Sequence, residues 1–146
     1  GSKSMAKVTL EQANKIIEAG QAKGRALDIG PLTIVVLDDG GHLVSMQRED
    51  KSGIMRFEIA FGKAWGGLAI GRSSRANETD FLTREHFGVA IAAASGGRVI
   101  PVAGGVLIRD ADGNVAGAVG VTGDSSDNDE ACAVAGIEAA GLTPQV

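Results

Sequence analysis

The two histidines are the side chains most open to chemical work in this chain of 146 residues, because imidazole titrates near neutral pH and binds metals and haem iron. His42 follows a Gly-Gly turn at the start of an expected strand, and His86 follows Arg84 and Glu85 ahead of an expected short helix. No His-x-x-x-His or Cys-x-x-Cys pattern surrounds either residue. Each is therefore either a solvated side chain or a ligand or acid–base group.

Arginine side chains provide a second possible chemistry. Arg72 and Arg75 enclose two serines just after an expected helix, and Arg98 lies further along the chain. Guanidinium groups and hydroxyls at this spacing could hold a carboxylate through charge-assisted hydrogen bonds. The alternative is a solvated loop whose charges are unrelated.

The acidic run that begins at Asp124 fails as an EF-hand, because the required glycine and terminal glutamate are missing. It favours a helix N-terminus, with Asp127 as N-cap and Glu130 as its capping-box partner. The glycines of residues 117–123 lack the Lys-Ser/Thr of a phosphate-binding loop. Lys63 is expected to snorkel or to pair with Glu58, and a Schiff-base role would require burial.

Composition narrows the class of protein. The net charge is −4 and the isoelectric point about 5.1, which argues against nucleic acid or an anionic membrane surface as partner. There is no run of eighteen apolar residues, and the one cysteine, Cys132, excludes an intrachain disulfide. We expect a cytoplasmic protein with Cys132 in its core. Gly1–Ser4, before Met5, has the character of a cloning scar, and residues 5–146 form one domain.

Periodicity and turn residues place the elements. Helices are expected at 9–27, where Thr9 and Gln12 form a capping box, and at 54–70, 87–94 and 127–140. Strands are expected at 32–37, 42–47, 99–108 and 115–122, and residues 71–83 are expected to be irregular. Two hairpins and several helices in this order indicate an α+β domain with an antiparallel sheet between helices.

Three glycines lie inside the expected second helix, at Gly62, Gly66 and Gly67. Each costs about 1 kcal/mol relative to alanine, a cost that close packing against a sheet or another chain would offset. Together with the apolar character of residues 54–70, they predict a homo-oligomer with this helix at or beside the interface.

The strongest motif lies between Val102 and Gly136. It contains Gly104-Gly105-Val106, the Asp112-Gly113 turn, the run GAVGVTG at residues 117–123, Asp129-Glu130 and the run AVAG at residues 133–136. In these residues the chain resembles the GlcG/HbpS-like family, which also supplies the C-terminal domain of PduO-type proteins. The resemblance covers roughly residues 9–140. It implies a profilin-like sheet flanked by helices, and assembly into multimers.

Several members of that family bind haem, and others are associated with cobalamin or glycolate metabolism. The resemblance therefore implies a small-molecule binding protein, with haem as a candidate ligand, that acts as a homo-oligomer. The alternatives are an enzyme or accessory protein acting on a small carboxylate near Arg72, His86 and Arg98, and a purely structural assembly module. The expected ligand-binding residues, with His86 favoured over His42 and with Met46 and Met55 as other possible iron ligands, are His86, His42, Arg72, Arg75, Arg98, Gly104 and Gly105.

Overall fold

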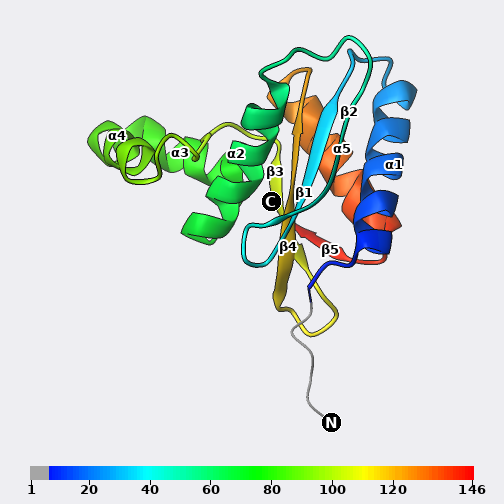
Figure 1. Ribbon diagram of the computed structural model, residues 1–146. Coiled ribbons are helices and arrows are strands. Elements are labelled where there is room, and N and C mark those ends of the chain that lie inside the picture. Colours follow the sequence, from blue (N-terminus) through cyan, green and yellow to red (C-terminus); the bar gives the residue numbers. More distant parts are fainter. Residues whose placement is uncertain (1–6) are drawn as a thin grey trace.

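The computed structural model describes residues 7–146, so the expected cloning scar at Gly1–Ser4 lies outside the described residues. A five-stranded antiparallel sheet in the order β2-β1-β4-β3-β5 lies between helices, which confirms the α+β class and the profilin-like arrangement (Figure 1). The elements are α1 (Leu10–Ala26), β1 (Thr33–Asp38), β2 (Leu43–Arg48), α2 (Arg56–Ile70), α3 (Ser74–Thr83), α4 (Glu85–Ala94), β3 (Gly105–Arg109), β4 (Val115–Thr122), α5 (Ser126–Ala139) and β5 (Thr143–Gln145).

Aspartates close the turns of both hairpins, β1–β2 and β3–β4. The Asp38 carboxylate accepts hydrogen bonds from the backbone N–H groups of Gly40 and His42. Asp110 does the same for Asp112 and Asn114 at the other hairpin. Because the side chain replaces missing backbone acceptors, each turn is set locally.

Helices α1 and α5 cover one face of the sheet. The expected capping box begins α1, because Thr9 accepts from the Gln12 backbone N–H and the Gln12 side chain accepts from that of Thr9. Ile16 and Ile17 of α1 pack with Ile137 of α5 over the apolar side chains of β1, β3 and β4. Cys132 lies in this core, as expected, and burial raises the pKa of its thiol to about 11.

Helix α2 covers the opposite face, against Val35, Leu37, Leu107 and Ala118. Its glycines lie where other parts of this chain leave no room for a side chain. A Cβ on Gly62 would lie 2.3 Å from Ile100 Cγ1, and one on Gly66 would lie 3.0 Å from Val99 Cγ1. The residues after α4 thus run directly over the helix, so these glycines give no support for a second chain packed on them.

Helices α3 and α4 form an arm that projects away from the sheet beside α2 (Figure 1). The expectation of irregular chain at residues 71–83 was wrong: Ser73 caps α3 by accepting from the Ala76 backbone N–H. Most residues of α3 are polar, so its sequence shows little of the hydrophobic periodicity that predicts a helix. Helix α4 is apolar in sequence, yet none of its residues is buried within the described chain.

Two further expectations need correction. The expected strand at 99–108 begins only at Gly105, because residues 99–104 instead follow α2 and the base of the arm, and β5 was not expected. The N-cap of α5 is Ser125, whose hydroxyl accepts from the Asn128 backbone N–H. Asp127 and Glu130 do not form a capping box, because both carboxylates bind Arg75 of α3.

A buried ion pair joins the layers on the two faces of the sheet. Lys63 Nζ of α2 lies 3.3 Å from the Asp129 carboxylate of α5 and donates to the Val121 carbonyl oxygen of β4 at 3.0 Å. Only 3% and 2% of the two side chains are exposed. Burial lowers the pKa of Lys63 and raises that of Asp129, and their mutual attraction opposes both shifts. Lys63 neither snorkels to water nor pairs with Glu58, so both expectations for this residue were wrong.

We predict that breaking this pair is costly. Lys63→Met or Asp129→Asn should each lower the free energy of unfolding by about 3–5 kcal/mol, because either leaves a charge buried without its partner. The double variant should recover part of the loss. Urea denaturation measures the effect, with Lys15→Met on the exposed side of α1 as the control. Single variants as stable as the control would contradict this role.

The corrected N-cap gives a second prediction. Ser125→Ala should cost about 0.5–2 kcal/mol, because the Asn128 N–H loses its acceptor. Asp127→Ala should cost less, since this side chain is 83% exposed and shares Arg75 with Glu130. Thermal unfolding of the two variants side by side tests the order, and a larger loss for Asp127→Ala would reverse the assignment.

Candidate ligand-binding site

Two of the three arginines expected to hold a ligand, Arg72 and Arg75, are engaged within the fold. Arg72 donates to the Asn77 side chain at 2.6 Å and forms an ion pair with Asp80 at 2.9 Å. Arg75 crosses to the N-terminus of α5, where Glu130 and Asp127 raise its pKa. These contacts brace the base of the arm.

Gly104 and Gly105 are buried where β3 begins. A Cβ on Gly104 would lie 2.8 Å from Lys63 Nζ, and the φ of +127° is itself one that glycine tolerates best. A Cβ on Gly105 would lie 2.3 Å from the Lys63 carbonyl oxygen. The structure therefore shows a packing reason for both glycines: they let α2 approach the sheet and let Lys63 reach Asp129.

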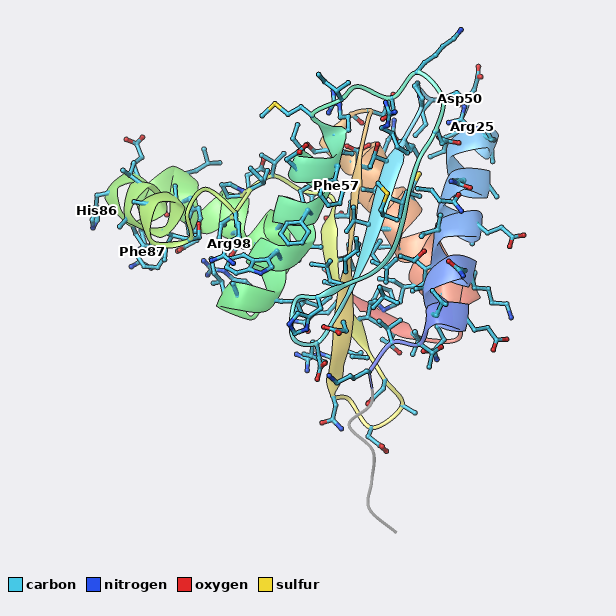
Figure 2. All side chains as sticks on the ribbon, viewed as in Figure 1. Arg25, Asp50, Phe57, His86, Phe87 and Arg98 are labelled. Carbon is cyan, nitrogen blue, oxygen red and sulfur yellow. The ribbon has the colours of Figure 1, made fainter. Side chains whose placement is uncertain are left out.

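Arg98 lies against α2, with its guanidinium carbon 4.1 Å from the centre of the Trp65 ring (Figure 2). Its Nε donates to the Ser95 carbonyl oxygen at 2.7 Å. Arginine over an indole face is a favourable cation–π arrangement. Arg98 therefore presents a positioned cation beside an aromatic surface.

The β1–β2 turn reaches the same tryptophan. A Cβ on Gly41 would lie 3.1 Å from two atoms of the Trp65 indole, so the turn backbone touches the ring edge. His42 is the next residue, with 78% of its side chain exposed and its Nδ1 3.3 Å from the Asp38 carboxylate. Burial alone would raise the pKa of Asp38. The hydrogen bonds from the two turn N–H groups and the nearby His42 have the larger combined effect, so the pKa is lowered. The carboxylate is thus ionised at neutral pH.

The turn before His42 and the segment that carries Arg98 thus both reach Trp65, although His42 and Arg98 are 56 positions apart. A shallow hollow of about 130 Å³ opens here, lined by Asp39, Gly40, Gly41, Trp65, Leu68 and Ala69. We call the surface formed by His42, Trp65 and Arg98 the tryptophan site. Sequence reasoning had named His42 and Arg98, but it assigned no role to Trp65 or Asp38. The spacing of Asp38 and His42 across a Gly-Gly turn was the available signal.

His86 lies at the far end of the arm, away from the tryptophan site (Figure 2). The α4 residues Glu85, Gly88, Val89 and Ala92 line an apolar hollow of about 290 Å³ with Phe81, Val99 and Pro101. His86 is exposed and does not belong to this lining. The structure therefore separates His86 from both His42 and Arg98.

Among residues 7–146, no group of three or more His, Cys, Asp or Glu side chains is placed to hold a metal ion. The same residues include no helix that is long and apolar enough to cross a membrane.

Comparison with known proteins identifies the family. A family model described as "Haem degrading protein HbpS-like" matches residues 8–138. A 15.0 kDa protein of Citrobacter freundii, encoded between dhaT and dhaS, is 28% identical over 128 residues, which are 88% of each chain.

Solved structures share the fold. A PduOC–haem complex superposes with a TM-score of 0.84 at 20% identity, covering 96% of this chain and 99% of that one. Klebsiella pneumoniae ORFY gives 0.82 at 22% identity, over 96% and 94%. An HbpS double mutant from Streptomyces reticuli gives 0.77 at 22% identity, over 94% and 89%. With the family model spanning nearly the whole described chain, and with this sheet and its helices recurring in these structures, the chain belongs to the HbpS-like family.

Proposed function

We propose that this protein binds haem at the tryptophan site and acts as a homo-oligomer. Two observations support haem binding. The family model is described as a haem-degrading protein, and a protein with the same fold has been solved as a haem complex. The observation that carries the choice of site is the contact between His42 Nδ1 and the Asp38 carboxylate.

A carboxylate beside one imidazole nitrogen is the usual arrangement around a metal-binding histidine. In the described chain no hydrogen bond occupies His42 Nε2. Asp38 is itself held by two backbone N–H groups, so the turn fixes the carboxylate that lies beside the imidazole. His86 shows no comparable support, and for this reason we place His42 ahead of it.

The other residues of the tryptophan site fit a haem as well. Trp65 and Leu68 provide apolar surface, and Arg98 provides a cation for a propionate group. The hollow of about 130 Å³ is smaller than the roughly 300–1,000 Å³ of usual ligand pockets, so one chain would cover only part of a haem. When bound, haem would supply the iron chemistry, and this chain would supply a nitrogen ligand from His42 and a cation, Arg98, to hold a propionate.

The arm supports the homo-oligomer. Helix α4 is apolar in most of its sequence, and its Val89 is 72% exposed. Leu82, at the end of the neighbouring α3, is 73% exposed. A helix that is apolar all round is normally buried, and large exposed apolar surfaces mark interfaces. A second copy of the chain packed on α4 would remove this surface from water.

Haem titration tests the ligand. Wild-type protein should develop a Soret band, and His42→Ala should shift the band and weaken binding about 10-fold or more, because the iron loses its nitrogen donor. Asp38→Asn should weaken binding by about 10–100-fold with a smaller spectral change. His86→Ala is the matched control and should resemble wild type. Loss of the band in His86→Ala alone would move the site to the arm, and unchanged spectra in all variants would remove histidine ligation.

Sedimentation tests the assembly. At micromolar concentration the wild type should sediment above the 14.8 kDa of one chain. Val89→Asp on α4 should shift it toward the single chain, because a buried charge without a partner disrupts an apolar interface. Ile54→Asp, at a site that is 90% exposed just before α2, is the control and should leave assembly unchanged. A wild type that sediments only as one chain would overturn the proposal, and dissociation by Ile54→Asp alone would transfer the interface to α2.

A further inference from the structure

We propose that Arg48 and Arg56 form a binding site for the carboxylate or phosphate group of a small polar metabolite, at the end of β2 opposite His42. The two ends of this six-residue strand are about 20 Å apart, so the site is separate from the tryptophan site. It does not depend on haem binding. We call it the arginine site.

Strand register places its residues in one row. Thr33 of β1 pairs with Arg48 of β2 on one side and with Thr122 of β4 on the other. Directly paired residues of antiparallel strands point to the same face, with Cβ atoms about 4.5–5.5 Å apart. Thr33 shares its face with Val35 and Leu37, which pack under α2. The row therefore lies on the α2 face, where Arg56 begins that helix.

Hydroxyl groups connect the two arginines. Arg48 Nη1 donates to the Ser52 carbonyl oxygen at 2.9 Å, and Arg56 Nη1 donates to the Thr122 hydroxyl at 2.8 Å. The Ser52 and Thr33 hydroxyls are 2.8 Å apart. Thr33, Ser52 and Thr122 are all buried, so the floor between the arginines is polar and fixed.

The positive charge of this site is not compensated within the described chain. Arg25, Arg72, Arg75 and Arg84 each lie within 4.0 Å of a carboxylate, whereas Arg48 and Arg56 have only neutral oxygen partners there. Glu49 forms an ion pair with Arg25, and the exposed Asp50 forms none with Arg48 or Arg56. The N-cap of α2, Met55, makes no side-chain capping bond, and the one acidic residue of the first turn, Glu58, forms no ion pair with Arg48 or Arg56.

An oxyanion is the ligand chemistry that satisfies two such guanidinium groups, because their fork of N–H donors matches carboxylate and phosphate oxygens. Arg48 also borders a polar cleft of about 400 Å³ whose other lining residues are Gln21, Arg25, Pro31, Gln47, Glu49 and Asp50. Gln21 and Arg25 belong to α1, so this cleft opens on the α1 side of the edge strand β2, and a metabolite held by the two arginines would reach it around that edge. Two of the lining residues, Arg25 of α1 and Asp50 just after β2, lie near each other at one end of the molecule (Figure 2). The cleft has the volume of an ordinary small-molecule site and would hold the polar remainder of the metabolite.

Titration with succinate and with inorganic phosphate, in haem-free protein, tests the arginine site. Each is added against sodium chloride of the same ionic strength, and binding is followed by calorimetry and by the melting temperature. At least one anion should bind the wild type and raise its melting temperature beyond the chloride control. The anion that acts at the lower concentration identifies the group as carboxylate or phosphate.

Arg48→Gln and Arg56→Gln should each weaken that binding about 10-fold or more, the usual effect of losing a charge-assisted hydrogen bond. Arg109→Gln is the matched control, since Arg109 also bonds only neutral oxygens, of Gln145 and Gly113. Arg48 is exposed, so its variant tests the site even if Arg56→Gln fails to fold. No binding beyond chloride, or an equal loss in Arg109→Gln, would overturn the proposal. The haem-free protein keeps this result independent of the haem titration.

Discussion

The structure depends most on the buried pair of Lys63 and Asp129. These side chains come from helices on opposite faces of the sheet and meet at the end of β4, beside the Val121 carbonyl oxygen. Burial of either charge alone is unfavourable, so each helix is held in the position at which the other can neutralise it. Gly104 belongs to the same arrangement, because a side chain there would occupy the space of the lysine ammonium group. The pair therefore sets where α2 and α5 lie along the sheet.

Close backbone approach is the second constraint on the fold. A Cβ on Gly120 would lie 1.9 Å from the Ala60 carbonyl oxygen, and one on Gly136 would lie 2.5 Å from that of Ile16. With few aromatic residues, the chain fills its core by bringing helices close to the sheet and to each other. The apolar residues of α4 take no part in this core. Their exposure on α4 is the reason to look for a second copy of the chain.

The two candidate binding surfaces lie at the edges of this tightly packed core. The β1–β2 turn carries His42 and contacts Trp65 through the neighbouring Gly41, and the opposite end of β2 presents Arg48 on the face where Arg56 begins α2. Both sites combine an edge strand with α2, so the position of that one helix controls both. The lysine–aspartate pair that fixes α2 consequently supports functional surfaces to which neither residue contributes a ligand contact.

Local sequence determined the elements whose signals are local: the Thr9–Gln12 capping box, the two aspartate-closed hairpins and the α+β class. It misjudged α3 and the N-cap of α5, because a polar helix carries little hydrophobic periodicity and several acidic residues compete for a cap. Only the tertiary structure decided that Lys63 pairs with Asp129 and that Arg75 spans to α5. It alone brought Arg98 to Trp65 and set Arg48 and Arg56 around one row of hydroxyls. These contacts join residues up to 66 positions apart, and their formation depends on how each helix packs on the sheet, which no local pattern encodes.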